Sequence, residues 1–188
     1  MPARRTRICA AFYIRARGCP WPRDRDAGVL AYNDRMPSIM LFEPEIPPNT
    51  GNLIRLCANT GARLHLVEPL GFSLSDKALR RAGLDYHQLA HVQRHADLAQ
   101  ARNAVTGRLL AFSTRGSTRY DRVAYRPDDV LLFGPETRGL PDTVLEALPE
   151  SQRLYLPMAD GSRSLNLANA AAVAFFEAWR QLDFAGAR

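Results

Sequence analysis

The sequence lacks the features of a membrane protein and of a small disulfide-stabilised protein. None of its apolar runs reaches the roughly 18 consecutive residues that a membrane-spanning helix needs. Its 188 residues include only three cysteines, which are too few and too odd in number for a disulfide framework. We therefore expect one soluble domain in a reducing compartment, the cytoplasm.

Lysine is almost absent: Lys77 is the single lysine among 25 basic residues, and all the others are arginine. The net charge of +6 is also unevenly spread, because residues 1–35 hold eight arginines and only three acidic residues. Residues 36–188 are nearly neutral. The basic composition alone therefore does not indicate nucleic-acid binding by the body of the chain. Any anion site there depends on local clustering of arginine.

Residues 1–35 show no hydrophobic periodicity. They contain scattered prolines and arginines and one apolar run, at residues 8–14. This run is at the lower length limit for a signal-peptide core and has no small-residue cleavage site. A targeting segment is the alternative interpretation. We expect a disordered leader or a start codon placed too early, with Met36 as the start, followed by a single domain over residues 36–188.

From Ser38 onward, short apolar runs alternate with helix-like segments. The runs predict buried strands at 39–42, 64–67, 109–112, 130–133 and 154–156. Helices are predicted after a turn at 47–51 as far as 59–61, and at 77–81, 97–104, 141–148 and 165–182. Strands separated by helices indicate an α/β fold, a parallel sheet with helices on both faces.

The predicted helix at 165–182 has almost no polar face. A helix that is apolar all round is buried on all sides. We therefore expect a partner subunit to cover one side, and a central helix within a monomer is the alternative. Ser164 is the expected N-terminal cap, whereas Asn166 and Asn169 need buried partners on so apolar a helix.

Three segments at strand or helix ends combine glycine with polar residues. Residues 49–55 (NTGNLIR) open a helix, whose free N–H groups suit an anion. Residues 131–140 (LLFGPETRGL) run from a strand into a glycine-containing loop, where parallel sheets bind ligands. This loop has neither the P-loop ending nor the three-glycine dinucleotide spacing, which disfavours an ordinary Rossmann methyltransferase or dehydrogenase. Residues 156–158 (LPM) and 162–170 (SRSLNLANA) form the third segment.

In order and separation, these three segments resemble the motifs of SPOUT methyltransferases, in the SpoU/TrmH branch. The strings EPEIPPNTGN (43–52), RRAGLDYH (80–87) and EAWRQL (177–182) are similar to the members of this branch that methylate the tRNA wobble nucleotide. The resemblance extends from about residue 39 to residue 182. One departure is Phe176, where tyrosine often stands in these relatives.

The resemblance implies an α/β-knot fold, in which the C-terminal part of the domain threads a trefoil knot. It implies a homodimer that binds S-adenosyl-L-methionine in the knot. The implied cofactor-binding residues come from the second and third segments and from the end of a strand: Phe112, Gly134, Pro135, Glu136, Gly139, Leu156, Met158, Ser164, Leu165 and Asn166.

The implied reaction transfers a methyl group from a sulfonium to the ribose 2′-hydroxyl of the wobble nucleotide, cytidine or uridine 34. Arg55 matches the catalytic arginine of the family. Because a guanidinium does not readily give up a proton, we expect Arg55 to hold the substrate phosphate and stabilise the developing alkoxide. Phosphate or water would then accept the proton. Glu136 is expected either to orient Arg55 or to brace its own loop.

Candidate contacts to the tRNA anticodon stem-loop are basic or polar residues near the motifs: Asn49, Arg138, Arg163, Lys77, Arg80 and Arg81. A solvated helix face is the alternative for the last three. His87, His91 and His95 recur at a spacing of four, which on a helix would form a zinc-binding face. A strand suits residues 92–93 equally well, and the resemblance implies no metal.

Two other functions stay open at the level of sequence. The chain could methylate another tRNA position or ribosomal RNA. The first 35 residues, however, are too few to fold as the extra RNA-binding domain that ribosomal RNA enzymes of this branch often carry. The chain could also be a knotted RNA-binding protein without catalysis, which the presence of Arg55, Glu136, Ser164 and Asn166 argues against.

Overall fold

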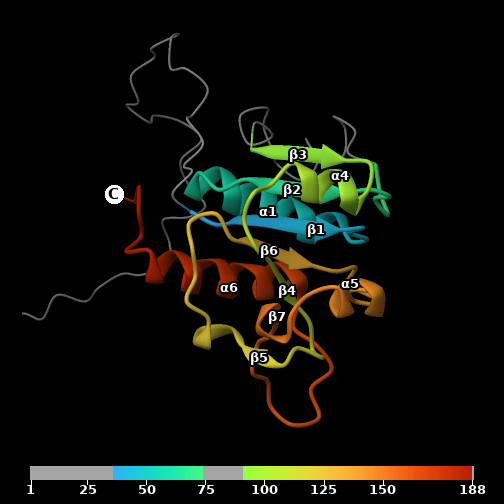
Figure 1. Cartoon of the computed structure of the whole chain (residues 1–188). Helices are drawn as coiled ribbons and strands as arrows, with labels where there is room; N and C mark the ends of the chain where they lie inside the picture. The colour runs from blue at the N-terminus through green and yellow to red at the C-terminus, as the bar shows by residue number, and fades with distance from the viewer. Residues whose placement is uncertain (1–35, 74–90, 188) are drawn as a thin grey trace, which may run out of the picture.

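The computed structural model describes residues 36–73 and 91–187 of the chain (Figure 1). The helix predicted at 77–81, and with it Lys77, Arg80, Arg81 and His87, lies outside these residues. In the described part of the chain, no helix has the length and apolar character that a membrane crossing needs.

Seven strands of the described chain form one sheet in the order β3-β2-β1-β6-β4-β7-β5, and every pair is parallel. This confirms the predicted fold class. The strands are β1 (Ser38–Phe42), β2 (Leu64–Val67), β3 (Val92–His95), β4 (Leu109–Phe112), β5 (Thr118–Arg119), β6 (Val130–Phe133) and β7 (Arg153–Tyr155).

All five predicted strands are present; β1 begins one residue earlier than expected, and β7 both begins and ends one residue earlier. Strands β2, β4 and β6 are buried at every residue, as continuous apolar runs in a parallel sheet require. The helical alternative for residues 87–95 is wrong where the chain is described, because residues 92–95 form β3. Strand β5 was not predicted.

Helices cover both faces of the sheet, as predicted (Figure 1). Helices α1 (Pro47–Thr60) and α6 (Leu167–Gln181) pack on one face, where Leu53 and Phe175 join a core with Ile39 and Leu131. Helices α4 (Leu98–Asn103) and α5 (Asp142–Glu146) pack on the other. The apolar contacts on both faces fix the central strands between two helical layers.

Helix α1 begins earlier than predicted. The expected turn at 47–51 is already helical, with proline at the first two helical positions, where a missing N–H costs no hydrogen bond. The helix ends at Thr60, and Gly61 caps it: Gly61 adopts φ +82° and donates its N–H to the carbonyl of Cys57 at 2.8 Å. Glycine adopts this left-handed conformation without steric cost.

Helix α6 begins later than predicted and has a different cap. The side-chain oxygen of Asn166, not Ser164, accepts hydrogen bonds from the N–H groups of Ala168 (3.0 Å) and Asn169 (3.2 Å). Both asparagines are exposed. Asn166 has the expected buried partner, because its side chain donates to Asn49 at 2.9 Å, whereas Asn169 lies on the exposed side of the helix and needs none. Helix α5 is also shorter than the predicted span 141–148, with Pro141 at its N-cap.

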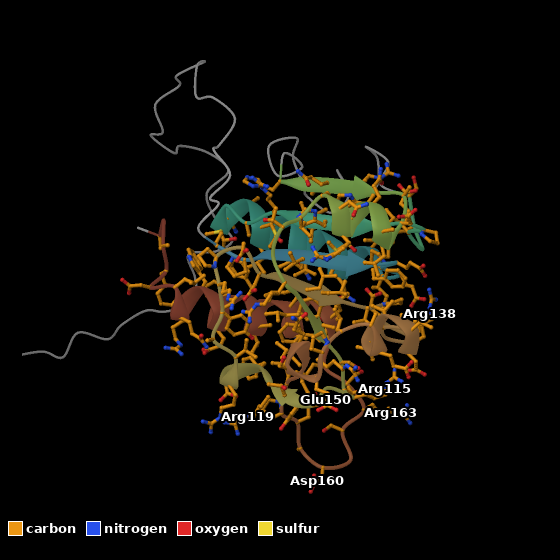
Figure 2. All side chains as sticks on the ribbon, in the orientation of Figure 1. Arg115, Arg119, Arg138, Glu150, Asp160 and Arg163 are labelled. Carbon is orange, nitrogen blue, oxygen red and sulfur yellow. The ribbon has the colours of Figure 1, made fainter. Side chains whose placement is uncertain are left out.

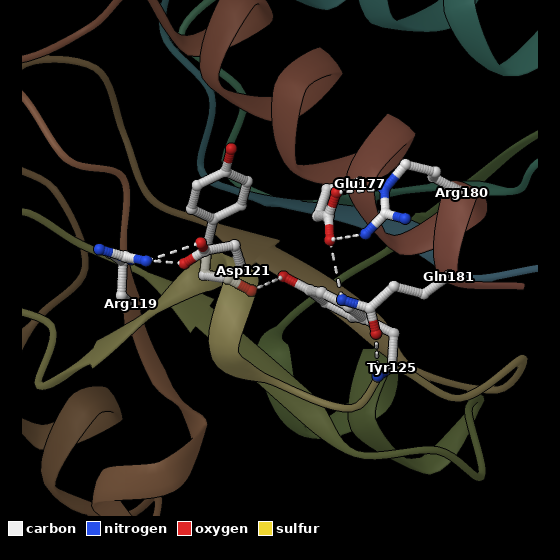
Figure 3. A network of polar contacts seen from close by, with 7 residues as sticks. Arg119, Asp121, Tyr125, Glu177, Arg180 and Gln181 are labelled. Carbon is white, nitrogen blue, oxygen red and sulfur yellow. Dashed lines mark hydrogen bonds and ion pairs between the residues drawn. The ribbon is translucent and has the colours of Figure 1, made fainter.

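Between β4 and β6 the chain first forms β5, which is the edge strand next to β7, and then passes the C-terminal end of α6 (Figure 3). There the N–H of Tyr125 donates to the side-chain oxygen of Gln181 at 3.2 Å, and the amide of Gln181 donates to Glu177 at 2.9 Å. The Tyr125 hydroxyl donates to the carbonyl of Tyr120 at 2.8 Å. These bonds fix the long β4–β6 connection against the last helix.

The amino ends of the strands hold a buried ion pair. Asp129 is fully buried just before β6, and the guanidinium of Arg108 donates to both of its oxygens at 2.8 and 2.7 Å. The N–H of Arg126 donates to the same carboxylate at 2.8 Å. This charge is therefore satisfied by hydrogen bonds, as burial requires.

Two histidines form a buried pair between β2 and β3. Nδ1 of His65 and Nε2 of His95 lie 3.0 Å apart, and both side chains are buried. Burial, the nearby His95 and the charge of Arg63 lower the pKa of His65 from 6.5 to about 4. Burial also lowers the pKa of His95.

The His65 pair predicts acid destabilisation. The folded state resists protonation at His65, so stability is retained above pH 6.5 and falls as pH drops from 6.5 toward 4. Between pH 7.5 and 4.5, urea unfolding should show the wild type losing about 2–3 kcal/mol more than His65→Asn. Equal losses in the two proteins would contradict this role of His65.

Candidate active site

A cavity of about 580 Å³ opens at the carboxyl ends of β4, β6 and β7. In parallel sheets this edge is where ligands bind. All of the residues predicted to hold the cofactor line it: Phe112, Gly134, Pro135, Glu136, Gly139, Leu156, Met158, Ser164, Leu165 and Asn166. Segments that are far apart in the sequence thus meet in one place. Their roles in binding stay predictions.

Sequence reasoning missed one wall of the cavity. Ser113, Thr114 and Arg115 directly follow β4 and line the same space, as do Ile46 and Phe133. Their position after a buried strand was the available signal, because loops at the carboxyl ends of neighbouring parallel strands converge.

The base of the cavity is aromatic. Phe112 and Phe133 end the neighbouring strands β4 and β6, and their rings stack with centroids 4.7 Å apart and planes 15° from parallel. Leu156, Met158 and Leu167 add apolar surface to the walls. A flat, largely apolar group would bury well against this set of side chains.

The loop at 134–139 turns back tightly on itself. A side chain at Gly134 would place its Cβ 2.4 Å from the backbone nitrogen of Leu140 and 2.5 Å from the carbonyl carbon of Gly139. Gly139 adopts φ +68°, and its N–H donates to the carbonyl of Pro135 at 2.9 Å. The loop shape therefore depends on glycine at both ends, for two different reasons.

The carboxylate of Glu136 joins this loop to the start of α1. It accepts hydrogen bonds from the N–H groups of Glu45 (2.8 Å) and Ile46 (3.3 Å) and from the side-chain amide of Asn49 (3.0 Å). Asn49 in turn accepts a hydrogen bond from the side chain of Asn166 at 2.9 Å. Glu136 thus braces its own loop, which was one of its two predicted roles, and Asn49 lies inside the cavity wall.

Three arginines line the cavity on the side of α5 (Figure 2). The guanidinium of Arg138 pairs with Glu43 and with Glu45, the latter at 2.8 Å. Arg115 pairs with Asp142 and donates to the carbonyl of Leu140 at 3.0 Å. Arg163 is exposed in the loop before α6. Two of these guanidinium groups are already partly neutralised, so RNA contact by Arg138 would compete with its two carboxylates.

The predicted catalytic residue occupies a different position. Arg55 is exposed on α1 and is not among the described residues that line the cavity. Asn49, at the start of the same helix, does line it.

A zinc site at the histidines finds no support in the described part of the chain. There, no three His, Cys, Asp or Glu side chains lie close enough to hold a metal ion. His95 instead pairs with His65.

Comparison with protein families decides the relationship. A model of the SpoU rRNA Methylase family matches residues 36–176. The chain belongs to this family. Curated relatives named tRNA (cytidine(34)-2′-O)-methyltransferase are 56% identical over 155 residues in Escherichia coli K12 and 57% identical over 150 residues in Methylovorus glucosotrophus. The alignments cover 81% and 79% of this chain and 98% and 97% of those relatives.

Solved structures of the SpoU family have the same fold. A structure that concerns the 2-OH methylation of C/U34 on tRNA superposes with a TM-score of 0.73 at 45% identity, covering 80% of this chain and 98% of the other. An AdoMet-bound rRNA methyltransferase from Sinorhizobium meliloti superposes with a TM-score of 0.65 at 29% identity, covering 78% and 57%. These neighbours imply the α/β-knot for the SpoU domain described here.

The packing at Gly134 predicts that its replacement damages the cavity. In Gly134→Ala the added Cβ would push the 134–139 loop away from Leu140, and we expect affinity for S-adenosylhomocysteine to fall about tenfold or more, measured by calorimetry. Gly161→Asn is the control, because its site has φ +79°, which asparagine tolerates, and open space around it. Unchanged affinity in Gly134→Ala would contradict the loop's role.

Proposed function

We propose that this chain methylates the ribose 2′-hydroxyl of nucleotide 34 in tRNA, with S-adenosyl-L-methionine as methyl donor. The observation that carries this function is the 56–57% identity to tRNA (cytidine(34)-2′-O)-methyltransferases along 97–98% of their length. The cavity supplies the independent structural support. The reducing cytoplasm, where tRNA is found, is the compartment we assign to it.

The residues present fit S-adenosyl-L-methionine. A cavity of about 580 Å³ lies within the usual range for small-molecule sites. The stacked Phe112 and Phe133 offer an apolar base for a flat ring, and Gly134 lets the backbone approach closely. Leu156, Met158 and the loop at 164–166 would hold the remainder. When bound, the cofactor supplies a methyl group on a positively charged sulfur.

The protein's own residues position the substrate and handle its charge. Arg55 is exposed and is not among the described residues that line the cavity, which supports a role toward the RNA rather than toward the cofactor. There it holds a phosphate of the substrate and stabilises the alkoxide that develops at the 2′-oxygen. Its guanidinium keeps its proton, so the hydroxyl proton passes to phosphate or to water. Asn49, Arg163 and Arg138 line the cavity itself and are the further candidates for RNA contact.

A ribosomal RNA target is less well supported. The chain spans only 57% of the AdoMet-bound rRNA methyltransferase from Sinorhizobium meliloti, whereas it spans nearly all of the nucleotide-34 enzymes. The aligned part of this chain therefore corresponds to nearly the whole length of the tRNA enzymes.

We also infer a homodimer, from the exposed side of α6. Val173 and Phe176, one turn apart on α6, are 46% and 45% exposed, although they belong to the most apolar segment of the chain. Large apolar side chains on one face mark an interaction surface. A second copy of the chain, which carries the same apolar face, would cover this side of the helix.

The placement of Arg55 predicts a separation of methyl transfer from cofactor binding. In Arg55→Ala, methylation of nucleotide 34 should fall about 100-fold or more, while affinity for S-adenosylhomocysteine stays within about twofold because the cavity wall is intact. The checks are 2′-O-methyl mapping of tRNA from cells with and without the gene, and calorimetry on the purified variant. A level of 2′-O-methylation at nucleotide 34 that is the same with and without the gene would overturn the proposed function.

The exposed α6 face predicts that a charge there breaks the dimer. Val173→Glu should convert a dimer to a monomer in size-exclusion chromatography with light scattering, because a carboxylate would be buried without a partner. Thr106→Glu, at an exposed position before β4, is the matched control and should stay dimeric. A monomeric wild type, or a dimeric Val173→Glu, would contradict the inferred interface.

A further inference from the structure

The loops after β1 and β6 exchange carboxylate contacts. The N–H of Glu45 donates to the carboxylate of Glu136 at 2.8 Å. In the opposite direction, the N–H and hydroxyl of Thr137 donate to one carboxylate oxygen of Glu45 at 3.0 and 2.7 Å. We call these reciprocal contacts of Glu45, Glu136 and Thr137 the Glu45 clamp.

The clamp joins the two parts of the site that must act together. Strands β1 and β6 are neighbours in register, with Leu41 opposite Phe133, so the loops that follow them lie side by side. The first loop runs directly into α1, which carries Arg55. The second forms the cavity wall at 134–139. The clamp thus links the loop at 134–139, which we call the methyl-donor loop, directly to the start of α1, the helix that carries Arg55.

Arg138 adds further contacts to the carboxylate of Glu45. Its guanidinium contacts the second carboxylate oxygen of Glu45 at 2.8 Å and also pairs with Glu43. Both Glu45 oxygens are therefore engaged. Hydrogen bonds from the side chain and backbone of Thr137 hold the pKa of Glu45 below its usual value, so the carboxylate is charged at neutral pH and is a poor proton acceptor.

The loop after β2 supports Glu45 from behind. The N–H of Gly71 donates to the carbonyl of Pro44 at 2.9 Å. A Cβ at Gly71 would lie 2.9 Å from the Cα of Glu45, so the two backbones are already in close contact. Glu43 adopts φ +48°, a conformation that non-glycine residues rarely take. The backbone of Glu45 is therefore packed closely against Gly71 and tied to the loop after β2 through Pro44.

We propose that Glu45 is a positioning residue for methyl transfer, which holds the methyl-donor loop at 134–139 in a fixed place relative to α1. The proposal rests on the function proposed above. Transfer of a methyl group requires the donor sulfur, the methyl carbon and the attacking oxygen to be in line. A displacement of about 1 Å is enough to cost about 100-fold in rate.

The test compares Glu45→Ala with Glu68→Ala. Glu68 also forms an exposed ion pair, with Arg94, and is not among the described cavity residues. At saturating tRNA and cofactor, the single-turnover rate should fall about 100-fold in Glu45→Ala and less than about twofold in Glu68→Ala. Affinity for S-adenosylhomocysteine should fall about tenfold in Glu45→Ala, because the cavity wall loosens.

Two further variants separate positioning from general stability. Glu45→Gln keeps an acceptor for Thr137, so its rate should lie between those of the wild type and Glu45→Ala. In a double-mutant cycle with Thr137→Val, the double variant should be no slower than Glu45→Ala alone, since the two residues act through one contact. Rates are expressed per cofactor-binding site, which removes any contribution from unfolded protein.

The outcomes distinguish the two proposals. A wild type that does not methylate nucleotide 34 overturns the proposed function, and the clamp is then judged by S-adenosylhomocysteine affinity alone. If Glu45→Ala has the same rate and the same affinity for S-adenosylhomocysteine as Glu68→Ala, the proposed positioning role of Glu45 is wrong. Additive losses in the double variant, or a lowered melting temperature with an unchanged rate per site, would also overturn it.

Discussion

The shape of the cavity depends on the hydrogen bonds that the carboxylate of Glu136 accepts. Its oxygens accept hydrogen bonds from two backbone N–H groups before α1 and from the side chain of Asn49. Through Asn49 the same chain of contacts reaches Asn166, which caps α6. Three separate segments are thus linked through the side chains of Glu136 and Asn49. Polar networks of this kind are stable only when every member has its partner, so the cavity walls form together.

The two ends of the sheet have different roles. At the amino ends, Asp129 and Arg108 form a buried ion pair that ties the starts of β4 and β6 together. At the carboxyl ends, the loops contain glycines in close backbone contact, together with charged side chains that line the cavity. The contacts that stabilise the sheet and the residues that line the cavity therefore lie at opposite ends of the strands. Backbone conformations that cost free energy at the cavity can then be offset by the packing elsewhere.

Much of the fold was predictable because buried parallel strands appear in a sequence as continuous apolar runs. Leu109–Phe112 and Val130–Phe133 are such runs. The two residues of β5 are neither apolar nor numerous enough to produce a period. The first turn of α1 has the composition of a loop, and its prolines fit a helix only at the positions they occupy. The cap of α6 was misplaced because serine and asparagine are equally good caps.

The site was predictable where a motif marks it and not elsewhere. Every cofactor-binding residue that the resemblance implies lines the cavity. Residues 113–115 also line it, but they belong to no motif and were missed. The ion pairs of Arg138 were also invisible to sequence reasoning, because Glu43 and Glu45 lie 95 and 93 positions away along the chain. Such contacts depend on sheet order, which local patterns do not encode.

The hydrogen bond between Asn49 and Asn166 spans 117 positions, and it has a consequence for how the molecule is made. A ribosome produces the chain from its amino end, so α1 and most of the sheet exist before α6 emerges. Contacts of such long range are also the slowest to form. The cavity is therefore completed last, because the residues from Leu156 to Ala170 that supply part of its lining are among the last to be synthesised.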